Sequence, residues 1–205
     1  MATVRFGWET FETRRWFFAG IAVITTVASM FASGIGGAFG QYGAASIIGN
    51  AVSFFLSAFI SLGMTAFFLA AHDAPERVDS RALWHPQQFL SYAVVQVVTG
   101  LAILLGLILL IVPGIILGLM FMFAPYLVVD RGLGPLEAIG ESRRITTGHK
   151  WELLKLSLLL VLVNLLGFIC LIVGLFVSIP VTMFAIVHAY RTLSAQAAAS
   201  APAHV

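Results

Sequence analysis

Two amide side chains lie deep in otherwise apolar stretches, where a polar group needs a partner. Gln96 is twelve residues after Trp84, and Asn164 is thirteen residues after Trp151. At about 1.5 Å per helical residue, both amides are predicted roughly 18 to 20 Å from the same membrane interface. Two interpretations follow. The amides align the third and fifth predicted spans through an interhelical hydrogen bond, or they line a polar pocket for a substrate.

Three basic residues gather in one short segment: Arg143, Arg144 and Lys150. Guanidinium and ammonium groups bind phosphate oxygens, so this cluster predicts contact with anionic lipid headgroups or with a phosphate-bearing ligand. The alternative is that these cations only orient the protein in the membrane. Glu141 lies three residues before Arg144, and the two are predicted to pair.

The other reactive side chains form no recognisable catalytic or metal-binding set. The histidines lack metal-ligand spacing and are His72, His85, His149, His188 and His204. Cys170 is the single cysteine, which excludes an intrachain disulfide. The sequence has neither a nucleophile elbow nor a phosphate-binding glycine loop. We therefore expect no enzyme activity, no cofactor and no metal.

The stretches that position these residues are those of a membrane protein. The sequence is 60% hydrophobic and 10% charged, too few charges to cover a water-soluble fold. Asp, Glu, Lys and Arg are absent from residues 16–72, 82–129 and 156–190. A transmembrane helix needs about 20 residues, so each gap predicts a helical hairpin, although the third is short and also fits a re-entrant segment. The predicted fold is all-α: a polytopic bundle of six transmembrane helices in three hairpins.

The expected spans form a single integral-membrane domain over residues 1–194. Its hairpin units are 1–71, 72–130 and 131–194, and residues 195–205 form a low-complexity tail predicted to be disordered. The predicted spans are 16–31, 45–71, 89–112, 115–129, 151–171 and a sixth ending near 190.

The second span carries a small residue at every fourth position. These residues are Ala45, Gly49, Ser53, Ser57, Ser61 and Thr65. Spacing by four places them on one stripe, which predicts a close helix-packing seam. A polar permeation stripe is the functional alternative, although hydroxyls also bond back to their own helix.

Prolines and one glycine mark the predicted hinges. Pro113 and Gly114 are predicted to reverse the chain between the third and fourth spans. Pro125 should kink or break the fourth span, and Pro180 should bend the sixth.

Two segments are predicted at the membrane surface. Residues 1–15 mix aromatic and charged side chains, which is typical of an interfacial helix, with a secretory signal as the alternative. Residues 134–147 predict a second surface helix, with Pro135 at its first position, Glu137 in its first turn and Gly148 at its exit.

The basic residues predict the orientation. With the N-terminus inside, every Arg and Lys lies on the cytoplasmic side, which places both termini in the cytoplasm and suggests a bacterial inner membrane. Trp16, Trp84 and Trp151 each open a predicted hairpin and serve as interfacial anchors. Their spacing of 68 and 67 residues also allows a threefold repeat, although little else aligns.

The second half of the chain resembles a family of multi-pass membrane proteins. The residues that carry the resemblance are Pro113-Gly114-Ile115, Ala124-Pro125-Tyr126, Asp130, Ala138, Ser142, Thr147-Gly148, Trp151 and Tyr190-Arg191. They look like the membrane domain found with some glycerophosphoryl diester phosphodiesterases and in YciC-like uncharacterised proteins. The resemblance implies a membrane fold but no activity, because the chain has no room for the soluble catalytic domain.

Two functions fit these observations best. The first is a non-enzymatic accessory or lipid-interacting membrane protein, with membrane lipids as partners and a protein partner or homo-oligomer left open. The second is a small transporter that uses Gln96, Asn164 and the kinks at Pro125 and Pro180. An intramembrane lipid enzyme is the third. Nucleic acid is not expected as a partner, because the basic residues flank apolar spans and form no long tract.

Overall fold

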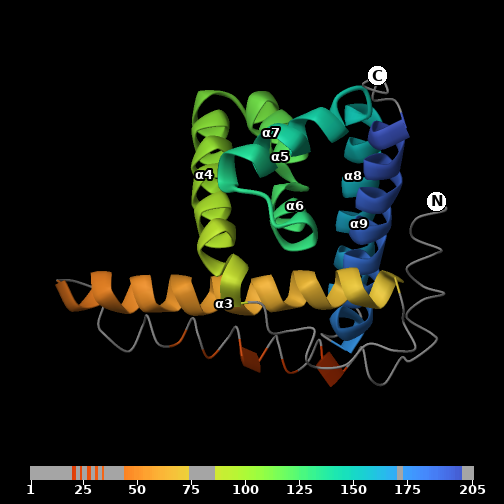
Figure 1. The fold of residues 1–205 in the computed structure, drawn as a ribbon. Helices are drawn as coiled ribbons and strands as arrows, with labels where there is room; N and C mark the ends of the chain where they lie inside the picture. Colours follow the sequence, from red (N-terminus) through yellow and green to blue (C-terminus); the bar gives the residue numbers. More distant parts are fainter. Residues whose placement is uncertain are drawn as a thin grey trace.

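A computed structural model describes residues 44–73, 86–169 and 173–199, with a few separate positions between 20 and 34. Every regular element in these ranges is a helix (Figure 1). The helices are α3 (Ala44–Asp73), η2 (Pro86–Gln88), α4 (Phe89–Leu109), α5 (Ile111–Phe121), α6 (Ala124–Arg131), α7 (Pro135–Thr146), α8 (Lys150–Ile169) and α9 (Val173–Ala199). The expected helix at 1–15, most of the first span, Trp16, Trp84 and Cys170 lie outside the described residues.

Four described helical stretches are long and apolar enough to cross a membrane. They are Ser46–Asp73, Phe89–Leu109, Ile111–Arg131 and Lys150–Ile169. Their outward faces expose large hydrophobic side chains, such as Leu104, Ile108, Leu158 and Phe168, as a helix surrounded by lipid requires. The all-helical, membrane-compatible fold class is therefore confirmed.

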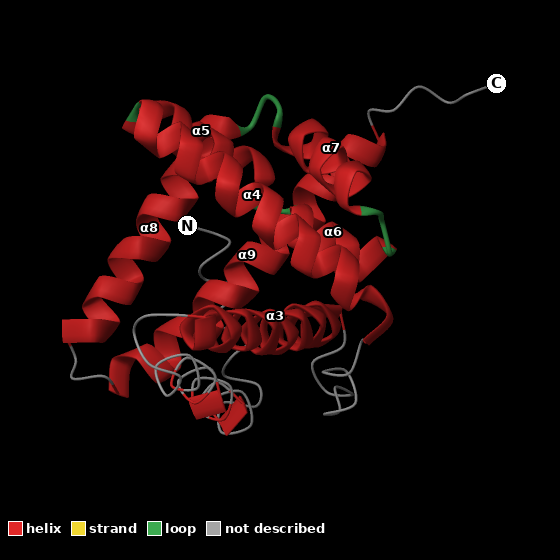
Figure 2. Cartoon of the chain, turned by 90° about the vertical axis from the view of Figure 1, so that its left-hand side faces the viewer, coloured by secondary structure: helices red, strands yellow, loops and turns green. Residues whose placement is uncertain are grey.

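The count of six spans and their arrangement as three hairpins are not confirmed. The helices α4 and α5 pack against each other, as do α8 and α9, so two hairpins are present. In contrast, α3 runs crosswise to α4 instead of alongside it, and both views show this crossing (Figures 1 and 2).

The reversal between α4 and α5 occurs before the predicted turn. Leu110 has an extended backbone (φ −168°, ψ 144°) and separates the two helices, whereas Pro113 and Gly114 lie inside the first turn of α5. The prediction that Pro113 and Gly114 form the turn was wrong. Pro113 is tolerated because the first turn of a helix lacks acceptors for its amides.

Gly114 serves close packing between the two helices. A Cβ atom at Gly114 would lie 2.6 Å from the Leu107 side chain, and one at Gly106 would lie 2.9 Å from the Gly114 Cα. Gly167 and Gly174 are in similarly close contact across α8 and α9. In both hairpins glycine therefore allows a close backbone approach.

The predicted interruption near Pro125 is confirmed. Helix α5 ends at Phe121, and α6 begins at Ala124 with Pro125 as its second residue. Helix ends leave carbonyl groups without partners. The Ser142 hydroxyl donates a 2.7 Å hydrogen bond to the Met120 carbonyl, so α7 stabilises this break.

The helix predicted over residues 134–147 is confirmed as α7, and its position at the membrane surface stays a prediction. Pro135 is the first residue of α7, and the Glu137 carboxylate accepts a 3.3 Å hydrogen bond from the Gly134 amide. Gly148 follows the helix with φ +90°, a backbone conformation that favours glycine.

The last helix is longer than predicted. Helix α9 contains Pro180 and ends at Ala199, so residues 195–199, which were assigned to a disordered tail, are helical. The bend expected at Pro180 stays a prediction.

The core lies where α3, α6, α7 and α9 meet. Its largest fully buried side chains are Phe67, Phe68, Phe123, Phe184, Leu127 and Tyr190. The Phe68 and Phe184 rings pack edge to face with centroids 5.0 Å apart, which joins α3 to α9.

Candidate functional site

The two intramembrane amides have different surroundings. The Asn164 Nδ2 atom donates a 2.8 Å hydrogen bond to Thr182 Oγ1, and Ser178 Oγ donates one of 3.0 Å to Asn164 Oδ1. Thr182 and Ser178 lie on α9, so Asn164 joins α8 to α9. The expectation that Asn164 aligns the third and fifth spans was wrong.

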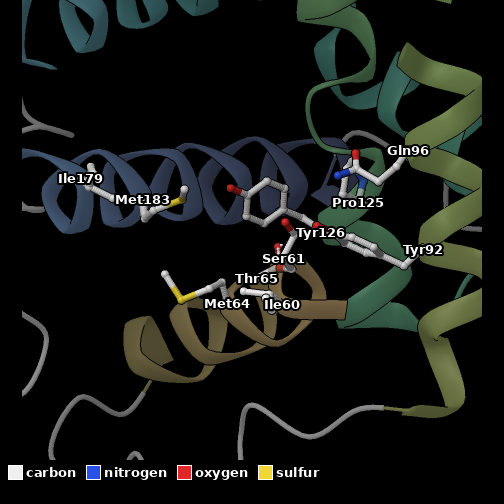
Figure 3. Close-up of a pocket in the computed structure, with 10 residues that line it drawn as sticks. All are labelled: Ile60, Ser61, Met64, Thr65, Tyr92, Gln96, Pro125, Tyr126, Ile179 and Met183. Atoms are coloured by element: carbon white, nitrogen blue, oxygen red, sulfur yellow. Dashed lines mark hydrogen bonds between the residues drawn. The ribbon is translucent and has the colours of Figure 1, made fainter. Parts of the chain in front are cut away.

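Gln96 instead lines a cavity of about 450 Å³ between α3, α4, α6 and α9 (Figure 3). The cavity is lined by Ile60, Ser61, Met64, Thr65, Tyr92, Gln96, Pro125, Tyr126, Ile179 and Met183. Its size is within the range of small-molecule pockets. A cavity is therefore present beside Gln96, and Asn164 is not among its lining residues; a polar pocket for a substrate stays a prediction.

Uncharged polar groups gather on the side of the cavity formed by α3, α4 and α6. Thr65 Oγ1 lies 3.3 Å from the Tyr92 hydroxyl and donates a 2.9 Å hydrogen bond to the Ser61 carbonyl. Gln96 and Tyr126 point into the same space (Figure 3). Neither tyrosine was predicted from the sequence to line a pocket, because an aromatic residue in an apolar run resembles ordinary core; Tyr126 appeared only among the residues that carry the family resemblance.

The small-residue stripe of α3 forms part of this wall. Gly49 is buried and Ser53, Ser57, Ser61 and Thr65 are half-buried, whereas the neighbouring Ile47 and Phe55 are exposed. The stripe therefore faces the protein, as a packing seam should. Its last two members also reach the cavity.

The three clustered cations differ in their partners. Arg144 donates to both Glu141 carboxylate oxygens, each at 2.7 Å, and Arg131 approaches the same carboxylate at 3.1 Å. The hydrogen bonds from Arg144 lower the pKa of Glu141, against the opposing effect of burial, and the same contact raises the pKa of Arg144. The predicted Glu141–Arg144 pair is confirmed.

Arg143 and Lys150 are both exposed, and neither forms an ion pair with a residue in the described ranges. Trp151 follows Lys150 and is 75% exposed. Two of the three predicted cations are therefore available to an external anion.

A further polar network was missed by the sequence reasoning. Arg191 contacts Asp73 at 2.6 Å and Asp130 at 2.8 Å, and Tyr190 donates a 2.6 Å hydrogen bond to Asp130. Arg131 also bonds to Ser194. Asp130 and Tyr190-Arg191 are among the residues that carried the family resemblance, which was the available signal.

Two histidines that looked unrelated in the sequence are neighbours in the fold. His72 Nε2 lies 3.2 Å from His188 Nδ1, and His72 Nδ1 lies 3.2 Å from Asp73. Within the described ranges, no group of three His, Cys, Asp or Glu side chains could hold a metal ion.

These observations define an all-helical protein with membrane-compatible helices, a cavity between them and a charged network at one end. The chain belongs to the family described as "Protein of unknown function (DUF975)", whose model matches residues 92–197. Comparison with curated proteins and with solved structures finds no match. The matched model is of an uncharacterised family and does not support the narrower YciC-like or phosphodiesterase-associated naming.

Proposed function

We propose that this protein is a non-enzymatic, lipid-interacting integral membrane protein that contacts anionic headgroups through α7 and the start of α8. The observation that carries the proposal is the outer face of α7. Leu136 is 79% exposed, and the exposed Arg143 lies seven residues later on the same face, whereas Ala138 and Ile145 are buried. An exposed apolar side chain beside a cation is typical of a helix at the headgroup layer.

Lys150 and Trp151 extend this surface into α8. Trp at headgroup depth and cations beside it are the usual anchors of a membrane helix. Because Arg144 is already neutralised by Glu141, the proposal assigns headgroup contact chiefly to Arg143 and Lys150.

We further propose that this face is cytoplasmic and that the membrane is the bacterial inner membrane. The positive-inside bias of the basic residues supports this orientation. A protein partner or a homo-oligomer stays a prediction.

The test is lipid retention by the full-length protein. The purified protein is exchanged from mixed phosphatidylglycerol and phosphatidylcholine into detergent, and the retained lipids are measured by native mass spectrometry. The double substitution of Arg143→Ala and Lys150→Ala should lower retained phosphatidylglycerol. The double substitution of Arg143→Lys and Lys150→Arg preserves charge and should match the wild type.

Arg144→Ala serves as a further control, with a smaller effect because Glu141 already neutralises Arg144. If the doubly alanine-substituted protein inserts normally and retains as much phosphatidylglycerol as the wild type, the proposal is wrong.

A small carrier is the second candidate, and the cavity at Gln96 is the observation that favours it. Flux of a labelled solute into proteoliposomes, abolished by Gln96→Leu and retained in the Arg143→Ala, Lys150→Ala protein, would favour a carrier over a headgroup-binding protein.

A further inference from the structure

The cavity at Gln96 lies among helices that suit the interior of a membrane. Its walls come from α3, α4, α6 and α9, and three of these helices belong to stretches long and apolar enough to span the bilayer. Molecules dissolved in the hydrocarbon layer are one source of ligands for a cavity between such helices. Lipids and other amphiphiles are therefore the first class of ligand to consider.

Two polar side chains in the cavity wall have no hydrogen-bond partner among the described residues. Neither the Gln96 carboxamide nor the Tyr126 hydroxyl makes a hydrogen bond to any residue that the structure describes. A polar group in hydrocarbon is costly unless it forms a hydrogen bond. Both groups point into the cavity, so a polar group of a ligand can satisfy them (Figure 3).

The side of the cavity toward α9 is apolar. Met183 and Ile179 come from α9, and Met64 comes from α3 (Figure 3). Methionine is flexible and polarisable, so it adapts to a chain of variable shape. The Tyr126 hydroxyl points toward Met183 (Figure 3), so the cavity offers polar groups from α4 and α6 and apolar side chains from α3 and α9 to one ligand.

None of the lining residues that the structure describes is Asp, Glu, Lys, Arg or His. A charged head would lose its hydration without gaining a counter-ion, which is unfavourable in the membrane interior. We infer that this cavity binds one neutral amphiphile of the acylglycerol class, with its hydroxyl or ester head at Gln96 and Tyr126 and its chain against Met64 and Met183. This binding goes beyond the proposed headgroup contacts and requires neither Arg143 nor Lys150.

The test is photo-crosslinking in nanodiscs of phosphatidylcholine. The probe is a monoacylglycerol that carries a diazirine in its chain, and the comparison probe is a fatty acid with the same diazirine chain. The monoacylglycerol should label α3 and α9 peptides that contain Met64 or Met183, and it should label them more strongly than the fatty acid does.

Two pairs of variants locate the head and the tail. Gln96→Leu and Tyr126→Phe should each lower labelling about fivefold, the effect of losing one hydrogen bond. Tyr190→Phe removes a hydroxyl outside the cavity lining and should leave labelling unchanged. Met183→Trp fills the tail side and should abolish labelling, whereas Leu158→Trp, at a 69% exposed position, should not. Thermal unfolding verifies that each variant is folded.

Labelling should also persist in the Arg143→Ala, Lys150→Ala protein, which separates this inference from the proposed function. Equal labelling of the wild type, Gln96→Leu and Met183→Trp would overturn the inference. So would stronger labelling of the cavity by the fatty acid, because a carboxylate head contradicts a neutral site.

Discussion

At the scale of single residues, a polar side chain inside the membrane takes its role from its partners. Asn164 makes hydrogen bonds to Thr182 and Ser178 on the neighbouring helix, so it stabilises the α8–α9 hairpin. Gln96 faces a cavity and forms no such contact with a described residue. One amide is therefore assigned to stability and the other to binding.

This difference predicts that replacement by leucine affects stability strongly at Asn164 and weakly at Gln96. Asn164→Leu removes two interhelical hydrogen bonds and should lower the free energy of unfolding by about 1 to 2 kcal/mol. Gln96→Leu should change it by less than about 0.5 kcal/mol, because no interhelical bond is lost. Thermal unfolding of both variants in the same detergent measures the difference. Equal destabilisation would contradict the two roles.

The Glu141 carboxylate gives a prediction that depends on pH. Contact with Arg144 lowers its pKa below the ordinary value of 4.5, so the charged form is stabilised in the folded protein. Glu141 is 18% exposed and Arg144 is 49% exposed, so solvent screens the pair, and Glu141→Gln should cost about 0.5 to 1 kcal/mol at neutral pH.

The sign of the pH effect follows from the lowered pKa. The stabilisation by Glu141 is fully present above pH 4.5 and is lost as the pH falls through the lower pKa of the folded state. The free energies of unfolding of the wild type and of Glu141→Gln should therefore become equal at acidic pH. A stability difference that grows as the pH falls below 4.5 would be inconsistent with this contact.

The sequence predicts how far along their helices Gln96 and Asn164 lie, but not which residues they contact. Counting from Trp84 and Trp151 gives a position along a helix axis, and that count located a cavity residue at Gln96. It cannot give the direction in which a side chain points around the helix. For this reason Asn164 was assigned to the wrong helix pair, whereas the pair of Glu141 and Arg144, on one helix, was predictable.

At the scale of elements, the α4–α5 and α8–α9 hairpins both pack closely through a pair of glycines. Gly106 meets Gly114 across α4 and α5, and Gly167 meets Gly174 across α8 and α9. The start of α7 was predictable from the sequence, because Pro135 and Glu137 act within a single helical turn. The signal at Pro113 and Gly114 was misread, because a glycine used for close packing looks the same in sequence as a glycine used for a turn.

Gly114 and Gly100 provide a matched test of this close packing between helices. A Cβ atom at Gly114 would lie 2.8 Å from the Leu107 backbone nitrogen, so Gly114→Ala should force the helices apart and cost about 1 to 3 kcal/mol. At Gly100 nothing lies within 4 Å, so Gly100→Ala should be neutral or stabilise α4 by up to about 1 kcal/mol.

Thermal unfolding of both alanine variants would measure this contrast. A destabilised Gly100→Ala protein together with an unaffected Gly114→Ala protein would show that the close approach is unimportant.

At the scale of the whole molecule, charged residues from distant parts of the chain meet at one end. Arg191 contacts Asp73 and Asp130, and Arg131 contacts Glu141, so these contacts join α3, α6, α7 and α9. Asp73 and Arg191 are 118 residues apart, and no local pattern could identify them as partners. The positive-inside rule nevertheless predicts that the basic members of this group share one side of the membrane.

The gathering of charges predicts which positions share a compartment. Thr147 and Ala198 are both exposed near the charged end. The Arg144 guanidinium donates a 3.3 Å hydrogen bond to the Ala197 carbonyl, which brings the end of α7 next to the end of α9. Thr147 and Ala198 should therefore face the same compartment.

Single cysteines in a Cys170→Ser background test this arrangement with a membrane-impermeant maleimide. Thr147→Cys and Ala198→Cys should both react in inverted vesicles, where the cytoplasmic face is outside, and neither should react in intact spheroplasts. Reaction of Thr147→Cys and Ala198→Cys from opposite sides cannot be reconciled with charges that meet at one end. Reaction of both in spheroplasts would keep the fold but reverse the proposed orientation, because the basic residues would then face outward.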